Sequence, residues 1–402
     1  MTQSVVIVGA GEAGGQAAIS LRQSGFTGPV TIVGDEPYIP YERPALSKQF
    51  LAGTLDLERL YLRAADFYTA RDITLKLDET VTSITRGQGV TLSKGEFLHA
   101  TDIILATGGR VRRLSIPGAH LDGIHYLRTI DDVLGFRDHM KPGLKLAIVG
   151  GGYIGLEVAA VAAKLGCRVT VLESDQRVLS RVAAPEASAF YERLHREEGV
   201  DLRTQVTVSG FSGTDHVRQV NCADGTELEA DLVVVGIGII PNTELAESVG
   251  LKIDNGIVVD DLTRTSSEHI YAIGDCSNHP NALLNRRLRL ESVQNALSQG
   301  KTAANTILGH EIPYAEVPWF WSDQYDVKLQ MVGINEPGDN VILRGDRNSR
   351  SFSICYLRAG VLVAINAINR PKDFIQSKKA IAAKISPDTT RLADPETPIK
   401  DL

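Results

Sequence analysis

Two glycine-rich turns in the sequence have the residue types and spacing that bind a dinucleotide. The first is Gly9-Ala10-Gly11-Glu12-Ala13-Gly14, after the apolar residues 5–8, and the second is residues 150–155, after the apolar residues 146–149. In such a turn the first glycine permits the bend, the second lets a pyrophosphate approach, and the third packs helix on strand. The phosphates then bind free N–H groups at the helix N-terminus. Two copies in matching context predict two dinucleotide sites.

An acidic residue follows the second apolar run of each copy. Residues 30–33 lead into Gly34 and Asp35, and residues 168–172 lead into Glu173. A carboxylate at this distance suits the hydroxyl pair of an adenosine ribose and repels a 2′-phosphate. We therefore predict NADH rather than NADPH for the second site, although Arg177 nearby is able to accept a phosphate.

Further polar residues lie between and after these two patterns. The proline-rich loop 38–48 carries Arg43 and Lys48, which are either solvated charges or neighbours of a flavin ring. Asp275 follows a short apolar run, and it either caps the helix expected over residues 293–307 or bonds a flavin.

The composition is that of an ordinary globular protein with two or three domains. The chain has 402 residues, of which 43% are hydrophobic and 23% charged, and its net charge is -7. The negative charge disfavours nucleic-acid binding. An apolar strand expected from residue 4 leaves no room for a signal peptide, and no apolar stretch is long enough to span a bilayer. We expect a cytoplasmic protein that binds neither membrane nor nucleic acid.

The cysteines do not form a dithiol pattern. They stand at positions 167, 222, 276 and 355, without a Cys-x-x-Cys pair. A dithiol redox site needs one sulfur to attack and another to resolve. We expect all four to be small buried residues.

The periodicity predicts an α/β protein with two Rossmann-like dinucleotide-binding domains and a small α+β C-terminal domain. Strands are expected at 73–77, 81–84, 89–92, 103–106, 232–235 and 236–238, then near 327–332, 341–343, 352–357 and 361–365. A helix is expected over 372–384, and the polar tail after Ser386 is expected to be loosely ordered. The predicted domains are 1–108 with 241–318 for FAD, 109–240 for NADH, and 319–402.

Four segments taken together resemble the FAD-dependent pyridine-nucleotide reductase family. They are residues 9–14, Leu105-Ala106-Thr107-Gly108, residues 150–155 and Ile273-Gly274-Asp275, in that order. Three further blocks are similar to the branch of oxygenase-coupled ferredoxin reductases: residues 43–48, 291–296 and 318–325. The match covers nearly the whole chain, and Ala45 stands where that branch commonly has a second proline.

The resemblance implies roles for individual residues. FAD would be bound, without a covalent link, by Gly9, Gly11, Ala13, Gly14, Asp35, Arg43, Lys48, Val81, Arg128, Asp275 and Val293. NADH would be bound by Gly150, Gly152, Tyr153, Ile154, Gly155, Glu157, Glu173 and Gly238. Catalytic roles fall to Lys48, which would favour the reduced flavin, to Tyr153, which would cover the flavin, and to Trp319, which would flank it.

The function implied is transfer of a hydride from NADH to FAD, then of single electrons to a [2Fe–2S] ferredoxin. That ferredoxin would serve a cytochrome P450 or a ring-hydroxylating dioxygenase, and the reductase would be a monomer or weak dimer. One alternative is an NADH oxidase or peroxidase, which needs a cysteine in the loop 41–48. Another is an NADH-sensing flavoprotein that regulates partner binding. An acidic ferredoxin would require a local cationic patch, for which the candidates are Arg286, Arg287, Arg289, Lys301 and Lys328.

Overall fold

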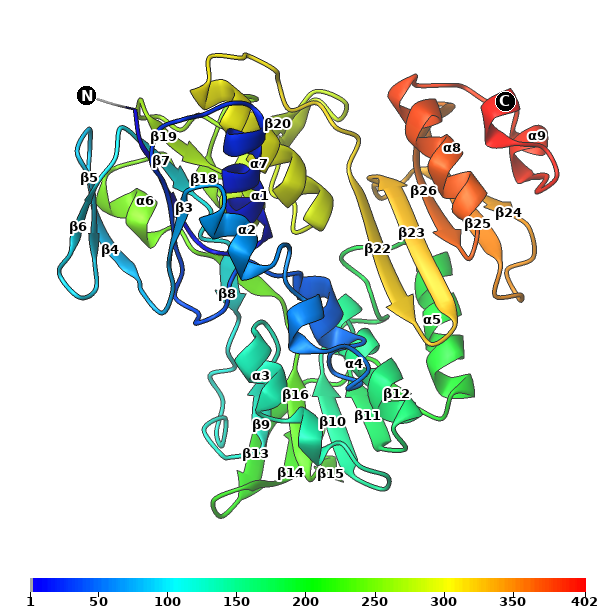
Figure 1. The fold of residues 1–402 in the computed structure, drawn as a ribbon. Helices are drawn as coiled ribbons and strands as arrows, with labels where there is room; N and C mark the ends of the chain where they lie inside the picture. Colours follow the sequence, from blue (N-terminus) through cyan, green and yellow to red (C-terminus); the bar gives the residue numbers. More distant parts are fainter. Residues whose placement is uncertain (1–2) are drawn as a thin grey trace. The chain divides into compact units, whose positions relative to one another are not determined.

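The computed structural model describes residues 3–402, which divide into two compact units (Figure 1). Unit 1 contains the chain up to Arg43, Leu57–Arg110 and Ile240–Glu316. Unit 2 contains Pro44–Asp56, Val111–Ile239 and Val317–Leu402. The chain leaves unit 1 through strand β8 (Gly109–Val111) and returns to it through β17 (Ile239–Pro241). Each unit is therefore assembled from segments that are far apart in the sequence.

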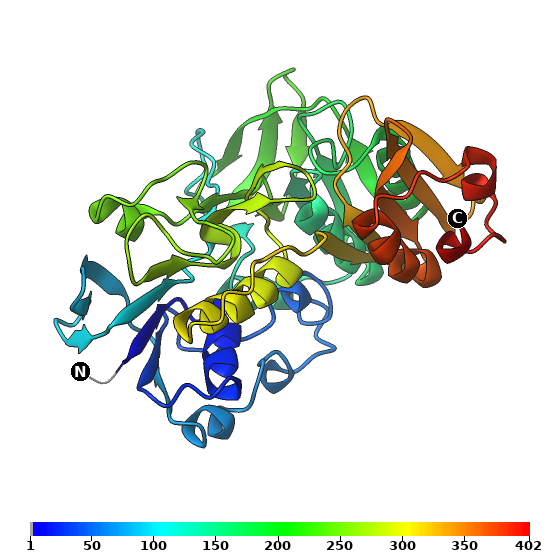
Figure 2. The same cartoon turned by 90° about the horizontal axis from the view of Figure 1, so that it is seen from above.

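The centre of unit 1 is a parallel five-stranded sheet in the order β19–β7–β1–β2–β3. Two helices, α1 (Glu12–Gln23) and α7 (Val293–Ile307), lie side by side against it (Figures 1 and 2). A Cβ at Gly300 of α7 would lie 3.0 Å from the carbonyl oxygen of Ala13, so glycine permits this close packing. The predicted helix over 293–307 is confirmed. The strands are β1 (Val5–Val8), β2 (Val30–Val33), β3 (Ile73–Lys76), β7 (Asp102–Leu105) and β19 (Ile270–Ala272).

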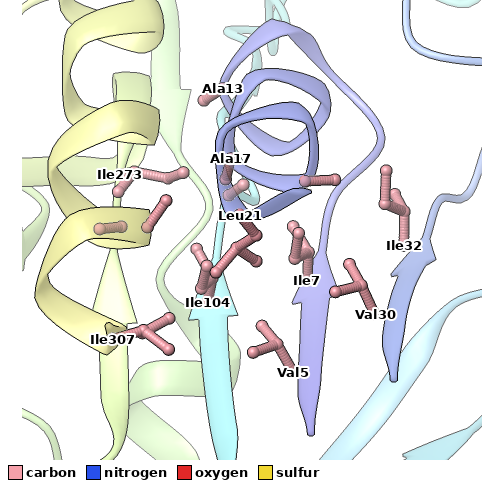
Figure 3. Packing of buried hydrophobic residues seen from close by; sticks show 14 of the residues in the cluster. Val5, Ile7, Ala13, Ala17, Leu21, Val30, Ile32, Ile104, Ile273 and Ile307 are labelled. Atoms are coloured by element: carbon pink, nitrogen blue, oxygen red, sulfur yellow. The ribbon is translucent and has the colours of Figure 1, made fainter. Parts of the chain in front are cut away.

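The residues of β1 alternate between two hydrophobic cores, as the period of a strand requires. Val5 and Ile7 pack with Leu21 of α1 and Ile307 of α7 (Figure 3). Val6 and Val8 belong to a second core, which also contains residues of β4 and β5. Both faces of the sheet are covered, which is why its strands read as continuous apolar runs.

The remaining elements of unit 1 surround this sheet. Strands β4 (Val81–Thr85), β5 (Gly89–Leu92) and β6 (Phe97–His99) form an antiparallel sheet. A third sheet has the order β18–β20–β21, formed by Ile257–Val258, Ser277–Asn281 and Arg286–Leu288. The short helices are α2 (Ala65–Thr69) and α6 (Glu244–Ser248), and the 3₁₀ helices are η2 (Leu57–Arg59) and η4 (Gly274–Cys276). The 3₁₀ helix η1 (Arg43–Ser47) begins at the last residue of one segment of unit 1 and otherwise belongs to unit 2.

Unit 2 repeats the strand–helix–strand arrangement around β10. Its parallel sheet has the order β12–β11–β10–β16–β9. The expected strand at 236–238 is wrong, because β16 ends at Val235 and Gly238 has a φ of +99°. The strands are β9 (Ile124–Tyr126), β10 (Lys145–Val149), β11 (Arg168–Leu172), β12 (Asp201–Arg203) and β16 (Leu232–Val235), beside an antiparallel sheet of β13 (Val208–Gly213), β14 (Val217–Cys222) and β15 (Glu227–Glu229). The helices are α3 (Ile130–Leu134), η3 (Arg137–His139), α4 (Tyr153–Lys164) and α5 (Pro185–Glu197).

The C-terminal part of unit 2 is an antiparallel sheet in the order β22–β23–β26–β25–β24, covered by α8 (Pro371–Ala382). The four strands predicted after residue 325 and the following helix are confirmed. They are β23 (Val327–Gly333), β24 (Asn340–Arg344), β25 (Phe352–Arg358) and β26 (Val361–Ile368), and β22 is Trp319–Gln324.

The expectation of a loosely ordered tail after Ser386 is wrong. This segment forms α9 (Thr389–Ala393) and η5 (Ile399–Asp401), in which Leu392 and Ile399 are buried. The cause is Arg344, whose guanidinium donates to the carbonyl oxygens of residues 392, 394, 395 and 397 and pairs with Asp373 at 3.0 Å. One buried arginine thus orders the end of the chain.

Candidate cofactor sites

The first glycine turn has a backbone that only glycine fits at two of its three positions. Gly9 has a φ of +117°, and a Cβ there would lie 2.2 Å from the carbonyl oxygen of Ala106. A Cβ at Gly14 would lie 2.1 Å from the oxygen of Gly9. At Gly11 a Cβ would meet nothing within 4 Å. The outer glycines are therefore needed by the chain itself, whereas the middle one leaves open space for a ligand.

The second turn, in unit 2, has the same division. Gly150 has a φ of +109°, and a Cβ on it would lie 2.5 Å from the oxygen of Gly236. A Cβ on Gly155 would lie 2.1 Å from the oxygen of Gly150, but one on Gly152 has its nearest contact at 4.0 Å. The fit to a pyrophosphate is therefore the same in both copies.

The helices that follow the two turns begin without a side-chain cap. Their N-cap residues are Gly11 and Gly152, which have no side chain to accept a helix N–H, whereas Thr129, Ser292 and Asp388 cap α3, α7 and α9. Uncapped N–H groups beside open space suit phosphate oxygens. The residues present thus fit the phosphates of a dinucleotide in both copies.

The acidic residues after β2 have divided roles. Asp35 is exposed, whereas the adjacent Glu36 accepts hydrogen bonds from Tyr41 at 2.7 Å and from Arg43 at 2.6 Å. Glu36 shares with Asp35 the position at which the sequence predicts an acid, but its role in holding the guanidinium of Arg43 was not predicted. Asp275 does not cap α7, because Ser292 accepts the hydrogen bond from the Asn295 N–H. The capping interpretation of Asp275 is therefore wrong.

The acidic residue after β11 folds back onto its turn. The Glu173 carboxylate accepts the Gly151 N–H at 2.6 Å and the Asp175 N–H at 2.8 Å. Arg177 donates instead to the carbonyl oxygens of Ser180 and Ala183 and to the hydroxyl of Ser188. The arginine that was expected to be able to accept a 2′-phosphate is thus held by its own loop.

A buried ion pair joins one predicted FAD residue to one predicted NADH residue. The ammonium of Lys48 lies 2.6 Å from Oε2 of Glu157, and the two side chains are 10% and 2% exposed. Ser47 donates to the same oxygen at 2.5 Å, and Ser322 of β22 donates to Oε1 at 2.6 Å. Burying a charge pair is costly unless further donors satisfy the carboxylate, and the two serines do so.

Neither Ser47 nor Ser322 was given a role by the sequence. Both stand inside blocks that carried the family resemblance, at residues 43–48 and 318–325. Their position in those blocks was the only available signal, since a serine has no spacing pattern of its own.

The two aromatic residues predicted to have catalytic roles pack against the C-terminal part of unit 2. The Tyr153 hydroxyl contacts the sulfur of Met331 at 3.0 Å, and its ring centroid lies 4.9 Å from that of Phe320. Burial, together with nearby acidic groups, raises the pKa of Tyr153, so its hydroxyl stays protonated. The Trp319 ring contacts Phe374, and the Lys378 ammonium lies 4.1 Å from its centroid.

The two units divide the residues predicted to bind FAD. Lys48 and Arg128 belong to unit 2, as does Trp319, which was predicted to flank the flavin, and the Arg128 N–H donates to Asp132 at 2.9 Å. All the predicted NADH residues also belong to unit 2. Unit 1 contains the other predicted FAD residues, which are Gly9, Gly11, Ala13, Gly14, Asp35, Arg43, Val81, Asp275 and Val293.

The cysteines offer no dithiol chemistry. All four are free; three are buried as expected, but Cys167 is partly exposed, which corrects the prediction for that residue. Burial raises the pKa of each thiol.

Among residues 3–402 no cluster of three His, Cys, Asp or Glu side chains could hold a metal ion. None of the helices described is long and apolar enough to cross a membrane.

The chain is similar to known proteins over almost its entire length. The family described as pyridine nucleotide-disulphide oxidoreductase matches residues 3–300, and the one described as reductase C-terminal matches residues 319–402. Putidaredoxin reductase of Pseudomonas putida is 46% identical over 407 residues, covering 99% of this chain and 96% of that protein. Rhodocoxin reductase of Rhodococcus erythropolis is 41% identical over 399 residues, covering 99% and 93%.

A solved structure shows the same similarity in three dimensions. A chain of the covalent putidaredoxin reductase–putidaredoxin complex superposes with a TM-score of 0.96 at 45% identity, covering 99% of this chain and 97% of that one. The predicted fold class and family resemblance are thereby confirmed.

Proposed function

Because the chain belongs to the pyridine nucleotide-disulphide oxidoreductase family, whose ferredoxin reductases use FAD and NAD(H), we propose that it passes electrons from NADH to a [2Fe–2S] ferredoxin. That ferredoxin serves a cytochrome P450 or a ring-hydroxylating dioxygenase. One observation carries the proposal. Two complete dinucleotide turns occur in one chain, while the loop 41–48 lacks the cysteine that a dithiol or peroxidase mechanism needs.

The two dinucleotides are assigned to different parts of the chain. Residues 1–108 and 241–318 bind FAD, residues 109–240 bind NADH, and residues 319–402 complete the enzyme. Gly11 and the N-terminus of α1 receive the FAD pyrophosphate, and Asp35 receives its ribose. Gly152 and the N-terminus of α4 receive NADH, and the Glu173 carboxylate selects it over NADPH.

When bound, FAD accepts two electrons as a hydride and returns them one at a time, which a pyridine nucleotide cannot do. The residues of the chain orient the two rings and exclude water. Lys48 supplies a positive charge that favours the reduced flavin, and Glu157 holds that charge at a defined position. Tyr153 shields the flavin until NADH binds. We propose that the protein is a monomer or weak dimer.

The test is steady-state reduction of three acceptors by NADH with the purified yellow protein. We expect a [2Fe–2S] ferredoxin to be reduced much faster than oxygen or hydrogen peroxide, and FAD to be released by acid. Faster reduction of oxygen or peroxide would favour an oxidase or peroxidase. If NADH reduced none of these three acceptors but changed the binding of a partner protein, the result would favour a regulatory flavoprotein. Faster reduction of a rubredoxin would contradict the assigned iron centre.

The cations proposed to dock the ferredoxin differ in availability. Arg289 is only 12% exposed and pairs with Glu291 at 2.7 Å, and Arg287 donates to the carbonyl oxygens of Val259 and Asn278. Lys301 is exposed on α7. We expect Lys301→Glu to raise the KM for the ferredoxin and leave ferricyanide reduction unchanged, because that small acceptor needs no docking surface. Lys252→Glu, at another exposed lysine of unit 1, is the matched control.

A further inference from the structure

The buried ion pair of Lys48 and Glu157 is the end of a longer chain of hydrogen bonds within unit 2. Ser322, which donates to Glu157, also lies 3.2 Å from Nε2 of Gln324. Oε1 of Gln324 lies 2.8 Å from Nε2 of His195, and Nδ1 of His195 lies 3.0 Å from the Tyr325 hydroxyl. Ser322, Gln324 and His195 are all at most 1% exposed. This polar chain connects α5, β22 and α4 through buried side chains.

The direction of every hydrogen bond in the chain follows from the carboxylate. An ionised Glu157 only accepts, so Ser322 must give it its single hydroxyl proton. The Ser322 oxygen then accepts from the amide nitrogen of Gln324, which turns the amide oxygen toward His195. His195 must therefore carry its proton on Nε2, and Nδ1 accepts from Tyr325. The opposite histidine tautomer would reverse the amide and leave Ser322 donating to Gln324 instead of Glu157.

His195 is suited to fix this direction because it stays neutral. Burial lowers its pKa to about 4, against the smaller opposing effects of Gln324 and Glu198. At neutral pH its ring thus has one proton and exists as one of two tautomers.

We propose that Gln324 and His195 are positioning residues for the Lys48–Glu157 pair: the Nε2–H tautomer of His195 orients Gln324, so that Ser322 donates to Glu157 and holds it against Lys48. The role of Lys48 at the flavin rests on the proposed function, whereas the direction of the hydrogen bonds does not. Strand β22, in the C-terminal part of unit 2, thereby helps to set the charge that acts on the flavin. Gln324 and His195 act through Ser322 and Glu157 and do not touch the flavin themselves.

The first measurement is the tautomer of His195 in the complete protein labelled with ¹⁵N-histidine. The chain has nine histidines, and His195→Gln identifies the signal by its loss. We expect a proton on Nε2 at pH 7 in the unmodified protein and a mixture of tautomers in Gln324→Met, which keeps the side-chain length but bonds neither neighbour. A proton on Nδ1 in the unmodified protein would overturn the proposal, whether or not FAD is bound.

The second measurement is the midpoint potential of bound FAD in Ser322→Ala, Gln324→Met and the control Ser353→Ala. Ser353 is a matched control, because it is a buried serine of the same sheet that donates to a buried carboxylate, Asp373, at 2.8 Å. We expect all three variants to lose thermal stability. Ser322→Ala should move the potential to more positive values, because Glu157 then loses the donor that holds it against Lys48 and neutralises Lys48 less well. Gln324→Met leaves Ser322 with Glu157 as its acceptor but no longer fixed by the amide, so it should move the potential in the same direction by less, and Ser353→Ala should not move it.

Equal potentials in all three variants and the unmodified protein would overturn the proposal, because the polar chain would then be purely structural. A protein that binds no FAD would contradict the proposed function instead, and the tautomer measurement would still test the hydrogen bonds.

Discussion

The two copies of the dinucleotide fold agree in their glycines and differ in their acidic residues. In both, a Cβ on the third glycine would lie 2.1 Å from the oxygen of the first, and one on the middle glycine has at least 4.0 Å of space. In the first copy Asp35 is exposed, whereas in the second Glu173 bonds the N–H of Gly151 within the turn. Packing of the chain thus fixes the turn, and the acidic residue is free to differ with the ligand.

The neighbouring arginines differ in the same way. In the first copy Arg43 is held by Glu36, so Asp35, the acid proposed to bind a ribose, is not used for that ion pair. In the second copy Arg177 is held by its own loop, so Glu173 is not neutralised by it. Both copies keep an arginine away from the acid that is proposed to bind a ribose, although they use different partners to do so.

Substitution of the third glycine should have the largest effect. We expect Gly14→Val to abolish FAD binding and to lower the free energy of unfolding by about 3 kcal/mol or more, because its side chain would overlap the backbone of Gly9. Urea unfolding and the flavin absorbance of the purified protein measure both effects. Gly155→Val creates the same overlap in the second copy and should keep FAD while losing reduction by NADH. If Gly155→Val also lost FAD, the assignment of the two copies to different ligands would be contradicted.

Substitution of the middle glycine should separate binding from folding. A side chain at Gly11 or Gly152 has room in the protein but occupies the position expected for a pyrophosphate. We expect Gly11→Val to purify colourless but to fold, with the urea midpoint of the unmodified protein from which FAD has been removed. Gly152→Val should be yellow, with a KM for NADH raised about tenfold or more, since the loss of one good phosphate contact costs about 1.4 kcal/mol or more. A yellow Gly11→Val protein would contradict the proposed FAD site.

The glycine turns could be predicted from the sequence because their causes are local. Spacing, apolar runs and the acidic residue all lie within one strand–helix–strand segment, and the helix over 293–307 was found with the bounds expected. The C-terminal strands were predictable for the same reason, because each alternates along its own length.

The Lys48–Glu157 pair could not be predicted, because 109 positions separate its members and no pattern joins them. The same holds for Ser322 and for the ordered tail, which depends on Arg344 of a different strand. Side chains that satisfy one another across elements leave no periodic signal in the sequence. The positions of the two glycine turns were therefore predictable from the sequence. The hydrogen bonds around the residues proposed to bind the cofactors were not.

Acid should destabilise both units through one buried histidine in each. Burial lowers the pKa of His195 and of His279 to about 4, and the nearby Arg287 contributes to the effect on His279. Because the unfolded histidine takes up its proton near pH 6.5, stability is complete above about pH 6.5 and falls as the pH drops toward about 4. The expected loss is roughly 2–3 kcal/mol for each histidine over that interval.

His279 is the better of the two to test, because it lies outside the polar chain of Glu157. Its ring meets Tyr314 edge-on with centroids 4.9 Å apart, so phenylalanine should replace it with little distortion. The urea midpoint of His279→Phe, measured at pH 7 and at about pH 4.5, should fall less than that of the unmodified protein. An equal fall in both would show that His279 does not contribute to the acid sensitivity.

The acidic residues themselves should give the smallest effect, and they test the comparison most directly. Glu173→Gln removes the negative charge and keeps the size of the side chain, so the preference for NADH over NADPH in kcat/KM should narrow by about tenfold, or about 1.4 kcal/mol. Asp35→Asn makes the same change in the first copy and should leave that preference unaltered, while FAD dissociates somewhat faster. Initial rates with ferricyanide and either nucleotide measure the preference, because this acceptor does not depend on docking. Since Arg177 is held by its own loop, it should not compensate by binding a 2′-phosphate in the unmodified protein. Equal kcat/KM for NADH and NADPH before any substitution would show that Glu173 serves only to hold the Gly151 N–H, and the difference between the acidic residues of the two copies would then not reflect selection against a 2′-phosphate.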